Sequence, residues 1–168
     1  MLYLLDANVL ITANNQYYAL DAVPEFWDWM LHVAGAGYVK MPRETLAELK
    51  GGNAQKDALH AWAASQDVRD ALALREDVDA DLVRKVIAEG YAPDLSDDEY
   101  DLLGQDPFLI AHAFRAPQDR VVVSMEVSKP SLARARRKVP DVCKTLNVRC
   151  RDTFQFIREL GFRTNWKT

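Results

Sequence analysis

Two short apolar runs stand out along the chain, and each of them ends at a polar residue. The first ends at Asp6, and the second is a β-branched run that ends at Ser124. Such runs are typical of strands that are buried on both faces, as in parallel sheets. Two further short apolar segments, one of them closed by Pro42, have the same character. Strands are therefore predicted over residues 2–5, 38–39, 120–124 and 148–150.

Apolar residues at helical spacing fill the intervals between these strands. Pro24 suits a first helical turn, Ser96 and Glu99 have the spacing of a capping box, and Asp106 before Pro107 suits a helix start. Residues 129–138 are basic and predict a loop or a mobile helix. Helices are expected soon after residue 6, over 24–34, up to the glycines at 51–52, and over 54–64, 67–90, 96–103, 106–111, 140–146 and 153–160.

Strands that alternate with helices predict an α/β fold. We expect a central parallel sheet of about four to five strands with helices on both faces. With 168 residues, the chain is expected to form a single domain over residues 1–168. No secretory signal and no apolar stretch of about 18 to 20 residues is visible, so we expect a cytoplasmic protein without membrane contact. Cys143 and Cys150 are expected to be reduced thiols.

The net charge of -4 conceals an asymmetry along the chain. Residues 67–101 hold 4 basic and 12 acidic residues, whereas residues 129–168 hold 11 basic and 3 acidic residues. The basic part predicts an anionic partner, and the alternative is a solvated surface with locally neutralising contacts. The basic side chains expected to contact the phosphates of such a partner are Lys129, Arg134, Arg136, Arg137 and Lys138.

Four acidic residues are predicted to meet at one edge of the sheet. Asp6 and Glu126 follow the ends of strands, Asp106 begins a helix, and Glu48 lies near the end of another. The functional crevice of open parallel sheets lies outside the carboxyl ends of the strands. Clustered carboxylates repel one another unless a cation lies between them, and Mg²⁺ or Mn²⁺ prefers oxygen ligands. Each residue also has an ordinary explanation, as a helix cap for the two aspartates and as a surface acid for the two glutamates.

The ordered set of motifs resembles the PIN-domain family. The segments that carry the resemblance are Leu5-Asp6-Ala7-Asn8, Glu44 to Leu49, Asp106 to Ala111 and Val122 to Glu126. A little-characterised PIN branch is similar in its Tyr-Tyr, Phe-Trp-Asp-Trp and Pro-Asp-Val-Cys segments, which here begin at Tyr17, Phe26 and Pro140. The resemblance covers nearly the whole chain and implies a single PIN-like domain.

This resemblance implies a metal-dependent ribonuclease, the toxin of a VapC-type pair with a cognate antitoxin and often a homodimer. Asp6, Glu48, Asp106 and Glu126 would be the catalytic and metal-binding acids. Position 126 departs from the Asp, Asn or Ser that many PIN proteins have there, so Asp141 is kept as a second candidate, ranked below Glu126. Asn8 is a candidate to orient water, and Ser124 to hold the acid cluster through its hydroxyl.

Two other functions are weighed against the nuclease. A non-catalytic PIN-like module that binds RNA or a protein would use the acids structurally, and the departure at Glu126 favours it. A phosphotransfer receiver or phosphatase shares Asp6 but lacks the accompanying acids, because position 8 is Asn and the upstream positions are apolar. Tyr17 and Tyr18 are candidates to stack bases, although we expect at least one of them in the core, as we do Trp27 and Trp29.

Overall fold

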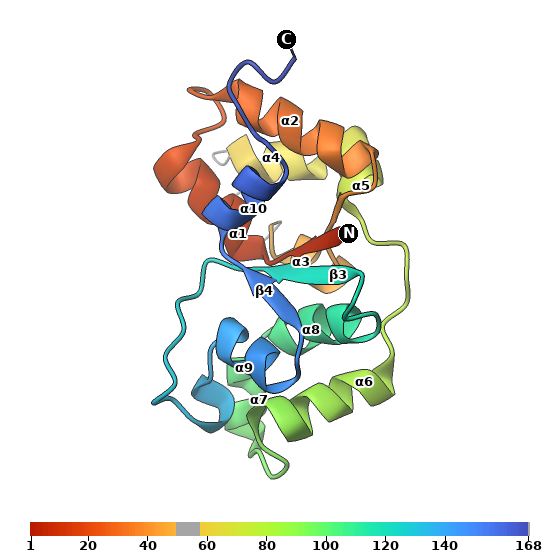
Figure 1. Cartoon of the computed structure of the whole chain (residues 1–168), viewed down its shortest axis with the longest axis vertical. Helices are drawn as coiled ribbons and strands as arrows, with labels where there is room; N and C mark the ends of the chain where they lie inside the picture. Colours follow the sequence, from red (N-terminus) through yellow and green to blue (C-terminus); the bar gives the residue numbers. More distant parts are fainter. Residues whose placement is uncertain (50–57, 168) are drawn as a thin grey trace.

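The predicted strands form one parallel sheet at the centre of the computed structural model (Figure 1). The structure describes residues 1–49 and 58–167. The strands are β1 (Leu2–Leu5), β2 (Val39–Lys40), β3 (Arg120–Val123) and β4 (Arg149–Arg151). They lie in the order β2-β1-β3-β4, and every neighbouring pair is parallel. The fold is therefore α/β with a four-stranded parallel sheet, as the sequence predicts.

The two central strands are apolar on both faces because each face packs against a core. In β1, Leu4 belongs to one core, whereas its neighbours Tyr3 and Leu5 belong to the other. In β3, Val122 faces the same side as Leu4. Leu5 pairs with Val123, so the residues that follow β1 and β3 emerge side by side at the carboxyl edge.

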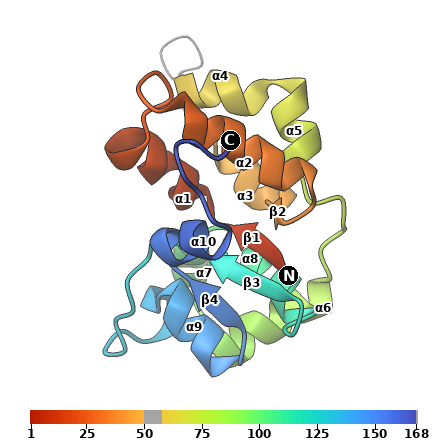
Figure 2. The ribbon, with the colours of Figure 1, turned by 45° about the horizontal axis from the view of Figure 1, so that its top comes forward.

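Helices cover both faces of the sheet, as predicted. Figures 1 and 2 show α2 and α5 on one side of the sheet, and α6 and α9 on the other. The first core is built by α1 (Ala7–Thr12), the π-helix η1 (Ala13–Tyr17), α2 (Pro24–Gly35), α3 (Arg43–Glu48), α4 (Ala58–Ala64), α5 (Gln66–Leu72) and α10 (Thr153–Glu159). The second is built by α6 (Ala80–Lys85), the π-helix η2 (Val86–Tyr91), α7 (Asp97–Leu103), α8 (Asp106–Phe114), the 3₁₀ turn η3 (Arg134–Arg136) and α9 (Val139–Thr145).

The single helical stretch predicted over residues 67–90 is wrong. Helix α5 ends at Leu72, and an extended segment separates it from α6. Within that segment Ala73 forms a parallel bridge with Met41, and the backbone N–H of Leu74 donates to the Met41 carbonyl at 2.8 Å. This pairing satisfies backbone groups that a continuous helix would have used, so a tertiary contact overrides the local helical preference.

Several local predictions are confirmed. Pro24 lies in the first turn of α2, and Ser96 forms a capping box with Glu99 at the start of α7. The basic segment 129–138 is a loop that contains the short turn η3. The helix predicted over 54–64 is described from Ala58, and its first four residues, like the glycines at 51–52, lie outside the described residues.

Cys143 and Cys150 are both free thiols, as predicted. Cys143 is buried in α9 and Cys150 is half-buried in β4. Across residues 1–49 and 58–167, no helix combines the length and the apolar character that crossing a membrane requires.

Candidate active site

Asp6 is buried where β1 meets α1. Its side chain is 5% exposed, and its Oδ1 accepts the backbone N–H of Asn8 at 3.3 Å, which caps α1. The backbone N–H of Asp6 donates to the carbonyl of Val123 at 2.9 Å. The aspartate is thus a helix cap, one of its two expected roles, and its carboxylate is at the same time fixed at the carboxyl edge between β1 and β3.

Ser124 holds Asp6 from the neighbouring strand end. The Ser124 hydroxyl donates to Asp6 Oδ2 at 2.8 Å, as the sequence analysis suggests. Asn8 joins the same network, because its Oδ1 accepts the backbone N–H of Met125 at 3.0 Å and its Nδ2 lies 3.5 Å from the Ser124 hydroxyl. Asn8 therefore ties the start of α1 to the segment after β3, and both of its polar side-chain atoms are already engaged.

Asp106 occupies the first residue of α8. The cap of this helix is Gln105, one residue earlier than predicted, and Pro107 follows within the first turn. A carboxylate in the first turn of a helix interacts favourably with the helix dipole. No hydrogen bond or ion pair from the described residues reaches the Asp106 carboxylate, so its charge is not neutralised by direct contact.

Burial and neighbouring carboxylates together raise the pKa of Asp106. The pKa of Asp106 is raised from 3.8 to about 8, and burial is the largest cause. The charges of Asp6, Glu126 and Glu48 contribute to this rise, in that order, whereas Lys138 opposes it. Since each of the other three acids acts on Asp106, the four predicted acids share one electrostatic environment. A strongly perturbed group of this kind is typical of functional sites.

Glu48 reaches this environment from the end of α3. The helix is anchored below the site by Thr45, whose buried hydroxyl donates to the Pro42 carbonyl at 3.1 Å and to the Leu5 carbonyl at 3.3 Å. Glu48 lies about one helical turn after Thr45 and is exposed to solvent. Partial desolvation, and then the charge of Asp6, raise the pKa of Glu48. Similarly, burial is the main cause that raises the pKa of Asp6, with Glu126 adding to it.

Glu126 differs from the other three acids because both of its carboxylate oxygens are engaged. Lys138 Nζ lies 2.5 Å from Oε1, and the backbone N–H of Val139 donates to Oε2 at 2.8 Å. Glu126 therefore satisfies the first backbone N–H of α9 and is neutralised by a lysine. It contributes charge to the site, but its oxygens are bound within the protein.

Asp141, the second candidate for the fourth acid, holds a loop in place. Its side chain is 8% exposed, it accepts the backbone N–H of Lys129 at 2.7 Å, and it accepts the Ser128 hydroxyl. The structure does not bring Asp141 into the group of carboxylates that act on Asp106. Its position is explained by the connection that it makes between α9 and the segment after β3.

The donor set of this edge consists of carboxylate oxygens, which are the ligands that Mg²⁺ and Mn²⁺ prefer. The charge of Asp6 acts on Glu48 and on Asp106, and the charge of Glu48 acts on Asp106; no ion pair with a described residue reaches any of the three. Within the part of the chain that the structure describes, no group of three or more His, Cys, Asp or Glu side chains is close enough together to hold a metal ion directly. The three acids therefore match a divalent cation in ligand chemistry, but in the described part of the chain they do not lie close enough together to bind one directly.

A cavity of about 420 Å³ adjoins the acids and brings basic residues beside them. Asp106 and Glu126 line it together with Leu132 and the consecutive residues 135–138. Helix α7 contributes Leu102, which is 65% exposed. The cavity therefore combines carboxylates, basic side chains and exposed apolar surface.

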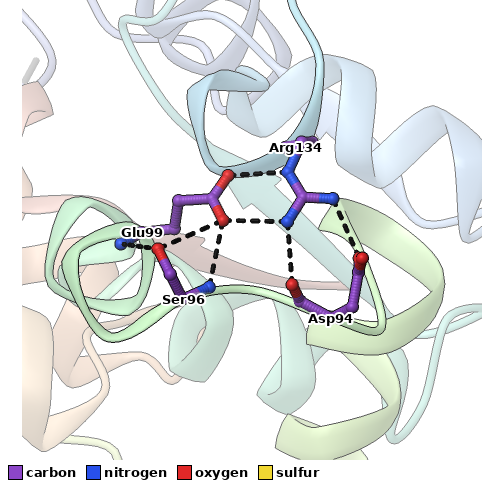
Figure 3. A network of polar contacts seen from close by, with 4 residues as sticks. All are labelled: Asp94, Ser96, Glu99 and Arg134. Atoms are coloured by element: carbon purple, nitrogen blue, oxygen red, sulfur yellow. Dashed lines mark hydrogen bonds and ion pairs between the residues drawn. The ribbon is translucent and has the colours of Figure 1, made fainter.

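Three of the five predicted phosphate-binding residues have partners within the protein. Arg134 donates to both carboxylate oxygens of Glu99 at 2.7 and 2.8 Å, and to Asp94 (Figure 3). This pairing lowers the pKa of Glu99 to about 2. Arg137 donates to the carbonyls of Gly90 and Asp141, and Lys138 pairs with Glu126 as described above.

Arg136 and Lys129 remain available to a ligand. Both side chains are exposed, and no hydrogen bond or ion pair joins either of them to the residues that the structure describes. Arg136 also lines the cavity that contains Asp106. Of the predicted basic set, Arg136 is therefore the residue best placed to contact a phosphate near the acids.

Residues 3–164 match the family described as a domain of unknown function, DUF4411. The chain belongs to the DUF4411 family. Comparison with curated proteins and with solved structures gives no match. All predicted site residues of this DUF4411 protein, from Asp6 to Asp141, lie within the matched range. The description of this family names no activity.

The aromatic residues of the DUF4411 chain divide between core and surface. Trp27 and Trp29 are each 2% exposed and belong to the core, as expected. Tyr18 stacks on Phe26 with ring centroids 4.4 Å apart, whereas Tyr17 is 44% exposed and meets Phe154 edge-on at 5.2 Å. Phe154 is not among the predicted site residues, because a half-buried Phe on a short terminal helix carries no distinguishing sequence pattern.

Proposed function

We propose that this DUF4411 protein is a metal-dependent endoribonuclease that hydrolyses RNA phosphodiester bonds at the carboxyl edge of its sheet. The observation that carries the proposal is the raised pKa of Asp106, about 8, caused by burial and by three further carboxylates, of which only Glu126 is paired with a cation among the described residues. A protein gains nothing structural from this repulsion, whereas a divalent cation would relieve it. The ordered motifs shared with PIN-domain proteins support the same activity.

In this proposal Asp6, Glu48 and Asp106 would hold Mg²⁺ or Mn²⁺. A bound ion would supply Lewis-acid chemistry that stabilises negative charge on the phosphoryl group and makes water a better nucleophile. Ser124 keeps the Asp6 carboxylate in position and, by donating to it, favours its charged form. Glu126 stays paired with Lys138 and influences the site through its negative charge rather than as a ligand.

The phosphate backbone would enter along the cavity that holds Asp106. Arg136 lines this cavity and has an exposed side chain, so it is the proposed contact to a phosphate that flanks the scissile bond. Lys138 lies beside the acids and lowers the pKa of Asp106 through its charge. Lys129 would contact a phosphate farther along the RNA strand. Arg134 and Arg137 support the loop that carries Arg136 and Lys138.

We further propose that the enzyme is a cytoplasmic toxin of a type II toxin–antitoxin pair. A cognate antitoxin that covers the cavity would bury Leu102, which lines it and is 65% exposed. The free thiols of Cys143 and Cys150 fit a reducing compartment. A homodimer is part of the same proposal, and it rests on the resemblance to PIN proteins.

RNA cleavage in Mg²⁺ or Mn²⁺ tests the proposal. We expect the full chain to cleave RNA, EDTA to stop the reaction, and Asp6→Ala and Asp106→Ala to abolish it while circular dichroism remains unchanged. Asp119→Ala is the matched control, because Asp119 is exposed at the amino end of β3 and should leave cleavage intact. Full activity of both purified site variants would refute the assignment.

A non-catalytic RNA-binding module is the second candidate, and the pairing of Glu126 with Lys138 favours it. An internal lysine beside the acids would then replace the metal as their counter-ion. A Mg²⁺ titration that detects no binding, together with RNA binding that Asp106→Ala does not change, would support this module and oppose the nuclease.

A further inference from the structure

A second cavity, of about 410 Å³, shares a wall with the acidic site. Glu126 lines both cavities, and Ser124, whose hydroxyl holds Asp6, lines the second one. The segment that follows β3 therefore separates two adjoining spaces. A chain-like ligand with a phosphate beside Asp106 would have its next chemical group within reach of this second cavity.

Most of the surface of the second cavity is apolar, although Glu126 and Asp152 also line it. Met125, Val127, Pro140 and Phe154 contribute to its walls. Phe154 is half-buried, with Tyr17 packed edge-on against it. The Thr153 hydroxyl lies 2.8 Å from Met125 Sδ and keeps that side chain in place. Such walls disfavour a charged phosphate but suit a flat, weakly polar ring.

Two polar side chains at this cavity have hydrogen-bond donors to spare. Gln155 Oε1 accepts the backbone N–H of Asp152 at 3.1 Å in the capping box of α10, and no described residue is hydrogen-bonded to its amide Nε2. Arg151 uses Nε toward Glu159 and Nη1 toward the Cys150 carbonyl, and within the described residues its Nη2 has no partner. Both groups are donors, so they suit a ring whose edge carries acceptor oxygen or nitrogen atoms.

We infer that this second cavity binds one unpaired nucleobase of single-stranded RNA, next to the phosphate that lies at the acidic site. The inference rests on the proposed function for the position of that phosphate. A volume of about 410 Å³ lies within the usual range for small-molecule pockets. Phe154 supplies the stacking face, and Gln155 and Arg151 address the acceptor edge of the base. A base inside a duplex is stacked and paired, so only an unpaired base can enter.

The test measures binding rather than cleavage, with EDTA present so that the RNA stays intact. A short single-stranded RNA is compared with a series in which one nucleotide at a time is abasic. We expect one position at which loss of the base weakens binding by about tenfold, as is typical of one stacked base. Equal affinity across the whole series, or equally tight binding of fully paired RNA, would overturn the inference.

Two variants locate the base on the protein. Phe154→Leu keeps an apolar side chain but removes the flat ring, so the intact and the abasic RNA should bind equally. Phe162→Leu is the matched control, because Phe162 is also half-buried against the same core but does not line the cavity. Gln155→Glu keeps the oxygen acceptor of the capping box and removes the amide donor, so it should weaken binding of the intact RNA more than that of the abasic RNA. An abasic penalty that Phe154→Leu and Gln155→Glu both leave unchanged would place the base elsewhere.

The outcomes separate this inference from the proposed function. Cleavage in Mn²⁺ without any abasic penalty would retain the nuclease and reject the base pocket. A penalty that depends on Phe154, in a protein that cleaves no RNA, would retain the base pocket and reject the nuclease.

Discussion

Replacing Asp106 by Asn should stabilise the metal-free protein at alkaline pH. The substitution keeps the size of the side chain and removes its charge. In the folded protein the pKa of Asp106 is about 8, because burial and then the charges of Asp6, Glu126 and Glu48 disfavour its ionised form. In the unfolded chain the same carboxyl ionises near its ordinary value of 3.8. Between pH 3.8 and about pH 8, Asp106 is therefore protonated in the native protein but ionised in the unfolded chain.

The sign of the effect follows from this difference in bound protons. A raised pKa contributes stability that is complete below pH 3.8 and is lost as the pH rises through about 8. Each pKa unit corresponds to about 1.36 kcal/mol, so the shift sets an upper limit of about 5 to 6 kcal/mol. Because Asp106 is half-buried, screening reduces this limit, and we expect Asp106→Asn to gain about 1 to 3 kcal/mol at pH 9 relative to pH 5.

Urea unfolding at pH 5 and pH 9 in EDTA measures this difference. Asp119→Asn is the matched control and should follow the wild type at both pH values. Mg²⁺ should raise the free energy of unfolding of the wild type at pH 9, and should do so much less for Asp106→Asn. If wild type and variant lose stability in parallel between pH 5 and pH 9, the described clustering of acids around Asp106 is refuted.

Three further predictions concern the groups around the acids. Lys138→Met removes the cation beside Glu126, so calorimetry should show Mn²⁺ binding that is about 3- to 10-fold tighter; unchanged or weaker binding would contradict the role given to Lys138. Arg136→Gln should weaken RNA binding and lower its salt dependence by about one counter-ion. Arg134→Gln should leave this salt dependence unchanged and instead speed hydrogen exchange in residues 129–138. Equal salt dependence in the two variants would contradict the assignment of Arg136 to phosphate binding and of Arg134 to loop support. Ser124→Ala removes a donor that lowers the pKa of Asp6, so the acid limb of the pH–rate profile should move upward by about one unit, and Ser124→Thr should restore it; a profile that does not move would show that this bond has no effect on Asp6.

The sheet and the position of Asp6 were predictable because they depend on local patterns. A continuous apolar run predicts a central parallel strand, and β1 and β3 both satisfy that rule. The polar residues that directly follow such strands must meet at one edge. The meeting of Asp6 with Ser124 is therefore a consequence of two short segments and of the topology that connects them.

The roles of the charged residues were less predictable, because they depend on partners far away in the sequence. Arg134 belongs to the basic part of the chain, and its partners Asp94 and Glu99 belong to the acidic part. Lys138 is paired with Glu126 in a similar way. Part of the charge asymmetry along the chain is thus neutralised within the fold, and only Arg136 and Lys129 of the five predicted basic residues stay unengaged among the described residues.

The end of helix α5 at Leu72 could not be predicted from the local sequence pattern either. The sequence from Ala73 onward has helical apolar spacing, and Val83 and Val86 are indeed buried as predicted. The extended segment exists because Ala73 pairs with Met41, at the end of a strand more than thirty residues earlier. Periodicity identifies which side chains are buried, but it does not identify a backbone pairing of this range.

A crystal of the protein soaked in Mn²⁺ would reveal whether the acids at the carboxyl edge bind a metal ion. We expect an anomalous difference peak at this edge of the sheet, contacted by Asp6 and Asp106 with Glu48 nearby, and absent from crystals of Asp106→Asn. We also expect Glu126 to keep its contacts with Lys138 and Val139. A saturating soak that leaves this edge without a peak, or that places manganese away from these three acids, would refute the proposed metal site.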